Sequence, residues 1–61
     1  MIAKFTEEAQ KILFGYGERI GKKHQCSGQY VRLIIKGKRN INTEKAKAIY
    51  QELIEIIERK L

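Results

Sequence analysis

The 61-residue sequence contains no proline and no tryptophan, one cysteine (Cys26) and one histidine (His24). One cysteine cannot form an intrachain disulfide, and a lone thiol is typical of a reducing compartment. The two residues together also fall short of the three or four ligands of a zinc site. The sequence therefore predicts neither a metal site nor a cofactor, and we expect both side chains to pack in a turn and against the core.

Long apolar segments are absent as well. No apolar run exceeds three residues, whereas a transmembrane helix needs about 20. The first residues, MIAKFTEE, lack the apolar centre of a signal peptide. We therefore expect a soluble cytoplasmic protein with no membrane partner, folded as a single domain over residues 1–61.

The positive charge is concentrated in the middle of the chain. The formal net charge is +6, yet residues 19–39 contain seven Lys or Arg residues and no Asp or Glu, so that all seven acidic residues lie outside this window. A basic region confined to one unit favours a polyanionic partner. Charge alone does not separate DNA from RNA, from an anionic membrane or from a merely solvated basic surface.

Apolar residues recur with helical spacing, which predicts an all-α fold: a compact domain of four helices, with a fifth left open. In the first helix Phe5 and Leu13 lie on one apolar stripe, and Thr6 is a suitable N-cap. A short second helix is predicted over about residues 18–24. Within it, Gly21 allows a neighbouring helix to approach closely.

The third segment has clear start and stop signals. Ser27 is a good N-cap, and Gly37 suits the left-handed position that often follows a helix. On a helical wheel of residues 28–36, Val31 and Ile34 lie on one side and polar or cationic residues on the other. We expect one face of this helix to be buried and the opposite face to carry hydrogen-bonding and cationic side chains.

A fourth helix, predicted over about residues 42–61, has an apolar face wider than a single core-facing stripe needs. We expect part of this face to lack a partner within the protomer. Heptad-like spacing allows two such helices to pair. Five residues on this face belong either to the core alone or to the core and a dimer surface: Tyr50, Leu53, Ile54, Ile57 and Leu61.

Residues 18–54 contain a series of features in a set order: the apolar–small pair Ile20-Gly21, the turn Gln25-Cys26, the cap Ser27, the buried positions Val31 and Ile34, and the capped helix start Asn42-Thr43-Glu44. This arrangement resembles the helix-turn-helix of the lambda repressor and Cro (XRE-type) superfamily, with the motif over about residues 18–37. The LacI family has a similar core, but its motif usually starts closer to the N-terminus. The superfamily commonly has glycine where this chain has Gln25, and a left-handed non-glycine residue costs on the order of 1–2 kcal/mol.

The resemblance implies that residues 28–36 form a recognition helix in the DNA major groove. On its outer face Gln29 suits an adenine edge, Arg32 a guanine edge and Leu33 a thymine methyl group. Tyr30, at the flank of this face, is the fourth base-reading candidate; contact with a sugar or phosphate and packing against the second helix are its alternatives. We expect contacts to the DNA backbone from Ser27, Gly28, Lys36, Lys38, Arg39, Asn40, Lys22 and Lys23.

These features predict a sequence-specific DNA-binding transcriptional regulator that binds a palindromic operator as a homodimer, in the cytoplasm and at the nucleoid. The resemblance implies a repressor of the phage or mobile-element kind. Two alternatives stay open. One is a protein-interaction module, such as an antitoxin or adaptor, that uses the apolar C-terminal helix. The other is RNA binding, which is disfavoured because only Tyr30 is placed to stack on a base. No carboxylate pair or activated nucleophile occurs in the basic window, so we expect neither an enzyme nor a small-molecule substrate.

Overall fold

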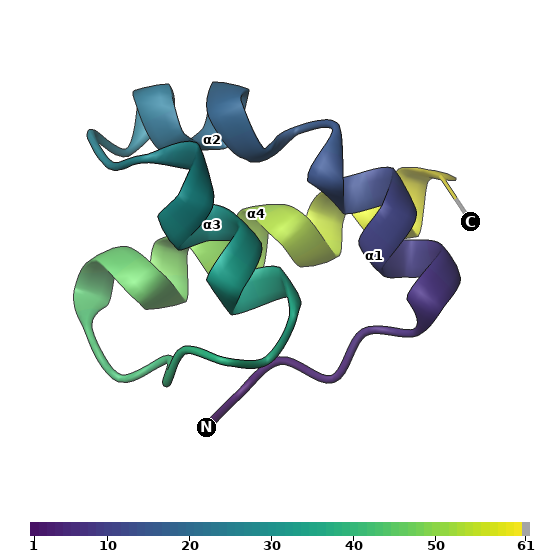
Figure 1. The fold of residues 1–61 in the computed structure, drawn as a ribbon, viewed down its shortest axis with the longest axis horizontal. Coiled ribbons are helices and arrows are strands. Elements are labelled where there is room, and N and C mark those ends of the chain that lie inside the picture. Colours follow the sequence, from purple (N-terminus) through teal and green to yellow (C-terminus); the bar gives the residue numbers. More distant parts are fainter. Residues whose placement is uncertain (61) are drawn as a thin grey trace.

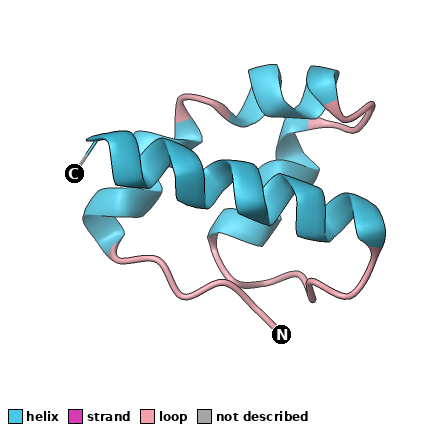
Figure 2. Cartoon of the chain, turned by 180° about the vertical axis from the view of Figure 1, so that it is seen from behind, coloured by secondary structure: helices cyan, strands magenta, loops and turns pink. Residues whose placement is uncertain are grey.

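The computed structural model describes residues 1–60, which form four α-helices and no strand. The helices are α1 (Glu7–Phe14), α2 (Gly17–Lys23), α3 (Gly28–Ile35) and α4 (Glu44–Lys60) (Figure 1). The longest helix, α4, runs across one side of the molecule, with the three shorter helices behind it in Figure 2. The predicted all-α class is confirmed for these residues. Leu61, which was assigned to the dimer surface, lies outside the described residues.

Capping side chains set the start of three helices. Thr6 Oγ1 accepts a hydrogen bond from the Ala9 amide at 3.2 Å, and Ser27 Oγ accepts one from the Tyr30 amide at 3.1 Å. The same bond occurs at the start of α4, where Thr43 is the acceptor. The predicted caps at Thr6 and Ser27 are confirmed, because each side chain satisfies an amide that has no partner within its helix.

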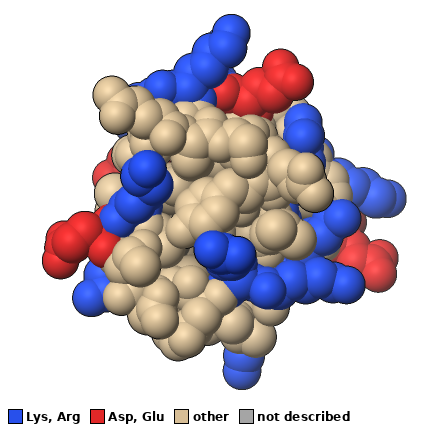
Figure 3. Space-filling view, turned by 60° about the vertical axis from the view of Figure 1, so that its left-hand side comes forward, with Lys and Arg blue, Asp and Glu red and all other residues tan. Residues whose placement is uncertain are grey.

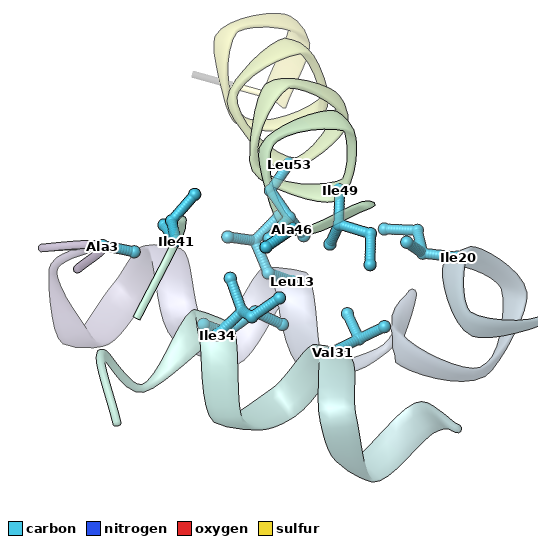
Figure 4. Packing of buried hydrophobic residues seen from close by; sticks show 10 residues of the cluster. Ala3, Leu13, Ile20, Val31, Ile34, Ile41, Ala46, Ile49 and Leu53 are labelled. Atoms are coloured by element: carbon cyan, nitrogen blue, oxygen red, sulfur yellow. The ribbon is translucent and has the colours of Figure 1, made fainter. Parts of the chain in front are cut away.

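The core is aliphatic, and all four helices contribute to it (Figure 4). Its largest fully buried side chains are Leu13, Ile20, Val31, Ile34, Ile35, Ile49 and Leu53. Leu53 has no exposed surface, so it cannot contact a second copy of the chain. This corrects its assignment to a dimer surface: Leu53 belongs to the core alone.

The apolar face of α4 is covered more completely than the helical wheel suggests. Among residues 1–60 the only exposed large hydrophobic residues are Met1 and Ile2, at the opposite end of the chain. The ring of Tyr50 lies 5.9 Å from that of Phe5, because α1 and the segment before it pack on α4. Of the residues assigned to a dimer surface, Tyr50, Ile54 and Ile57 are half-buried.

The segment before α1 packs against the loop between α3 and α4, which no sequence pattern indicated. The Ile41 amide donates to the Met1 carbonyl oxygen at 2.6 Å, and Ala3 and Ile41 are both 4% exposed. The segment passes over Gly37, where an added Cβ would lie 2.7 Å from the Ala3 carbonyl oxygen. Gly37 has a φ of +76°, as its predicted position after the helix requires. Glycine is therefore required at position 37 for two reasons: the backbone is left-handed there, and the segment around Ala3 passes close to it.

Gly21 allows α2 to contact the start of α3 through its backbone. A Cβ built on Gly21 would lie 2.7 Å from the Cys26 carbonyl oxygen and 3.1 Å from the Gly28 amide nitrogen. Both neighbours are main-chain atoms, which cannot swing away as a flexible side chain can. The close approach expected at Gly21 is confirmed.

We expect Gly21→Ala to lower the free energy of unfolding by about 1–3 kcal/mol, because the new methyl group overlaps fixed backbone atoms. Helix propensity alone predicts the opposite, since alanine stabilises a helix interior by about 1 kcal/mol relative to glycine. Urea unfolding followed by circular dichroism measures the change. Gly15→Ala is the matched control, because its nearest atom, the Ile12 carbonyl oxygen, lies at 3.6 Å. An equal loss in both variants would refute the explanation from close approach.

Candidate nucleic-acid interface

The turn between α2 and α3 reverses the chain within four residues. The Cys26 amide donates to the Gly21 carbonyl oxygen at 2.7 Å, and the His24 amide donates to that of Ile20 at 3.0 Å. Between them Gln25 has a φ of +59°, and it is the only non-glycine residue of the described chain with a positive φ. The turn therefore keeps the left-handed conformation at Gln25 without the glycine that would adopt it at no steric cost.

The turn and the Ser27 cap determine which side of α3 faces outward. Val31, Ile34 and Ile35 are fully buried. On the other side Gln29 and Lys36 are exposed, while Leu33 is half-buried. Exposed and buried positions thus alternate with the helical repeat, and the predicted division of this helix into two faces is confirmed.

Arg32 lies closer to the body of the protein than Gln29 does. A Cβ on Gly17 would meet Arg32 Nε at 3.4 Å and Arg32 Cγ at 3.5 Å. The Arg32 stem therefore runs along the first turn of α2, and the side chain is half-buried. Its guanidinium group is held at the α2 side of the outer face of α3.

Gly28 has a structural reason to be glycine that differs from the expected one. The sequence analysis placed Gly28 among the residues expected to contact the DNA backbone. In the structure the space beside Gly28 is taken by Glu18 of α2, whose Cγ would lie 3.2 Å from an added Cβ. Packing between α2 and α3 therefore accounts for this glycine.

Three cations of the acid-free window 19–39 lie over aromatic rings. Arg39 Cζ is 5.0 Å from the centroid of the Tyr30 ring, Lys36 Nζ is 5.8 Å from that of Phe14, and Arg19 Cζ is 5.9 Å from that of Tyr16. All three rings are partly buried and pack against the core. Phe14, Tyr16 and Arg19 were not among the predicted site residues. The spacing of Tyr16 and Arg19, three residues apart, could have revealed that pair; the Phe14–Lys36 pair has no local signal.

Basic side chains surround an apolar and polar area on the face that Figure 3 brings forward, and acidic side chains appear only towards its margins. Gln29, Lys36, Lys38 and Lys22 are exposed, as their predicted roles require. The acid-free window is evident from the sequence alone. In the structure, the four exposed residues belong to α2, α3 and the loop that follows α3.

Besides Ser27, which caps α3, two of the residues expected to contact the DNA backbone have side-chain partners within the protein. Lys23 Nζ forms an ion pair with Glu52 Oε1 at 3.2 Å, and Asn40 Oδ1 accepts from the Met1 amino group at 2.7 Å. The carboxylate neutralises Lys23 locally, so Lys23 is a weaker candidate for a phosphate contact than Lys22 or Lys38. The bond from Met1 uses only the Asn40 side-chain oxygen and leaves the amide N–H donors of Asn40 for a phosphate.

Glu52 and Lys45 connect α4 to the turn. His24 Nε2 lies 3.0 Å from Glu52 Oε1, and Lys45 Nζ donates to the Gln25 carbonyl oxygen at 3.4 Å. Burial raises the pKa of the Glu52 carboxyl, but hydrogen bonds from His24 and Lys23 outweigh it, so that the pKa lies below its ordinary value of 4.5. The contacts join residues 20 to 29 positions apart, which explains why no spacing rule found them.

Comparison of the chain with protein-family models, curated proteins and solved structures gives no match. Residues 1–60 form no pocket and bring no three metal-ligating side chains together. None of the helices built by these residues combines the length and apolar character needed to cross a bilayer. The physical features of the surface are therefore the basis for assigning a function.

We expect Gln25→Gly to stabilise the fold by about 0.5–1 kcal/mol. The substitution relieves a left-handed penalty of about 1–2 kcal/mol, offset by the greater backbone entropy that glycine loses on folding. The bond from Lys45 is unaffected, because it ends on the main-chain oxygen. Thermal and urea unfolding measure the gain. Gln25→Ala retains a Cβ at the same φ and should give no gain; stabilisation by both variants would contradict the assignment of strain.

The contact between Glu52 and its two partners should make stability depend on acid pH. A carboxyl group whose pKa is lowered by folding stabilises the protein above its unfolded-state pKa, and this contribution disappears as the pH falls through the folded-state pKa. We expect Glu52→Gln to destabilise the protein at pH 7 by about 1 kcal/mol or less, since Lys23 is 65% exposed and water screens the pair. Urea unfolding between pH 7 and pH 3 should show the two proteins converging in acid.

Glu55→Gln is the control for this measurement, because Glu55 is exposed on the same helix. A constant difference between Glu52→Gln and the natural protein across the whole pH range would contradict a role for the ionised carboxylate.

Proposed function

We propose that this protein binds double-stranded DNA in a sequence-specific manner, with α3 inserted in the major groove, and acts as a small transcriptional regulator. The observation that carries the proposal is the outer face of α3. On this face Gln29 and Lys36 are exposed and Arg32 and Leu33 are half-buried. The face lies opposite the buried side of the helix and belongs to a 21-residue window that has seven cations and no carboxylate.

The dimensions of α3 suit this role. A helix with its side chains is about 10–12 Å across and fits the major groove, which is about 12 Å wide, and the eight residues of α3 make it about 12 Å long. Gln29 is exposed near the start of the helix, where it suits the donor and acceptor pair of an adenine edge. Leu33 lies one turn further along and suits a thymine methyl group. Arg32 is a candidate for a guanine edge on the side next to α2.

Phosphate contacts position such a helix without reading sequence. Lys36 and Lys38 at the end of α3 and Lys22 on α2 are exposed and suit this role. The amides at the start of α3, next to Ser27 and Gly28, add hydrogen-bond donors of the same kind. With cations on more than one element around α3, the helix can be held against both DNA strands that border a groove.

The regulator in this proposal belongs to the lambda repressor and Cro type that the sequence resembles and acts at the nucleoid as a homodimer on a palindromic operator. The half-buried residues Tyr50, Ile54 and Ile57 of α4 are its dimer surface. Because a protomer of this size buries a limited core, contacts between protomers would add stability. The alternative of an antitoxin or adaptor would use the same half-buried face of α4, so DNA binding itself separates the two.

Selection of bound sites from random DNA duplexes tests the proposal. We expect enrichment of two inverted half-sites about one helical turn apart, as two recognition helices related by a twofold axis require. Affinity should fall with salt, with a log–log slope of about −0.9 per neutralised phosphate. A pool without a recovered motif, or an affinity that does not respond to salt, would overturn the proposal. Recovery of a motif with a single half-site would overturn the proposed homodimer but not the proposed DNA binding.

Two exposed positions provide matched variants for the selected site. Gln29→Ala should cost about 1–3 kcal/mol and relax the preference at one base pair. Lys38→Ala should weaken all sequences alike and make the salt slope shallower by about 0.9. If the effects of the two variants were interchanged, α3 would not be the reading element.

A further inference from the structure

Cations and aromatic rings are paired in a way that the proposed function does not by itself require. Each of the three pairs takes its cation from the acid-free window and its ring from a side chain packed on the core. The shortest is Tyr30–Arg39, at 5.0 Å from guanidinium carbon to ring centroid. The two residues come from different elements, α3 and the loop that follows it, so the pair depends on the fold.

An aromatic ring restrains a cation differently from a carboxylate. A carboxylate that holds a cation also neutralises it and occupies its N–H donors, as Glu52 does for Lys23 at 3.2 Å. A ring attracts the cation through its electron-rich face and carries no net charge. Arg39 beside Tyr30 therefore keeps its full positive charge and its planar set of donors, which match the oxygens of a phosphate.

The position of the Tyr30 ring is itself well determined. Its backbone amide is bound by Ser27 Oγ at 3.1 Å, and its side chain packs against the core. The exposed Arg39 side chain, on a loop without helical hydrogen bonds, would otherwise sample many rotamers. The ring limits this sampling and keeps the guanidinium group alongside α3.

We propose that Tyr30 is a positioning residue, which acts on DNA through Arg39 and does not read a base: it holds the Arg39 guanidinium, still charged, where a phosphate beside α3 can bind it. This inference rests on the proposed DNA-binding function. It assigns Tyr30 a role different from the base contact that its place on α3 suggested.

A double-mutant cycle on the selected DNA site tests the role. Tyr30→Leu should weaken binding about two- to fivefold, the range of an exposed cation–π contact. The salt slope should stay unchanged, because the cation is still present. Arg39→Ala should weaken binding and make the slope shallower by about 0.9. In the Arg39→Ala background, Tyr30→Leu should have no further effect.

Two conservative variants separate positioning from other roles of the tyrosine. Tyr30→Phe retains the ring and should bind within about twofold of the natural protein, because only the ring face is used. Ile12→Val, which alters a half-buried side chain of α1 outside the proposed DNA and dimer surfaces, controls for loss of packing and should leave DNA affinity unchanged. Thermal unfolding of each variant shows that the compared proteins are folded.

Several results would overturn the positioning role. Equal losses in Tyr30→Phe and Tyr30→Leu would indicate that the hydroxyl contacts DNA. A loss from Tyr30→Leu that persists in the Arg39→Ala background would indicate a direct contact, and a changed preference at one base pair would indicate base reading.

A measurement without DNA separates this inference from the function on which it rests. In the free protein the Tyr30 ring current should shift the Arg39 Hδ resonances upfield, and Tyr30→Leu should abolish the shift. Absence of the shift in the natural protein overturns the pair and its role while leaving DNA binding intact. If the shift is present but the natural protein binds no duplex, the proposed function fails, and the positioning role fails with it.

Discussion

The approach of the α2 backbone to the start of α3 is the contact on which the rest of the structure depends. It can form only because residue 21 has no side chain: an added Cβ would lie 2.7 Å from a carbonyl oxygen. The approach lets the Cys26 amide bond to the Gly21 carbonyl oxygen, which closes the turn. This turn places Ser27 at the start of α3 and directs Val31 into the core. The exposure of Gln29 on the opposite side follows from the same geometry.

The turn is also held from outside by α4. Glu52 contacts Lys23 and His24, and Lys45 reaches the Gln25 carbonyl oxygen. Of the seven cations in the acid-free window, these contacts pair only Lys23 with a carboxylate. The chain thus treats its cations in two ways. Lys23 is paired with a carboxylate, whereas Lys36 and Arg39, at and after the end of α3, lie over rings that carry no net charge.

Features that depend on a few neighbouring residues could be predicted from the sequence. The caps at Thr6 and Ser27, the left-handed Gly37 and the division of α3 into two faces all follow from local hydrogen bonding or from the helical repeat. Features that depend on three-dimensional packing could not. The contact of Glu52 with His24 spans 28 residues, and the packing of Ala3 against the chain near Gly37 spans more than 30.

Two further residues show that one residue type can satisfy several environments. A helical wheel places Leu53 on an apolar face but does not show how much of that face is covered, so the choice between the core alone and a shared dimer surface stayed open until the structure showed Leu53 fully buried. A glycine at position 28 suits a close approach to any neighbour, and the neighbour is Glu18. In both cases the residue type fits the structure, but the sequence alone could not predict which part of the protein the residue contacts.

The separation of the two faces of α3 has a consequence for how this protein can change. Its buried positions are aliphatic and belong to the core, whereas Gln29 on the outer face is exposed. Surface substitutions of this kind usually alter stability by less than about 0.5 kcal/mol. The outer positions can therefore diversify while the scaffold is retained, which makes the domain a suitable framework for libraries randomised on one face. Arg32, which leans on Gly17, is the outer position at which such freedom is smallest.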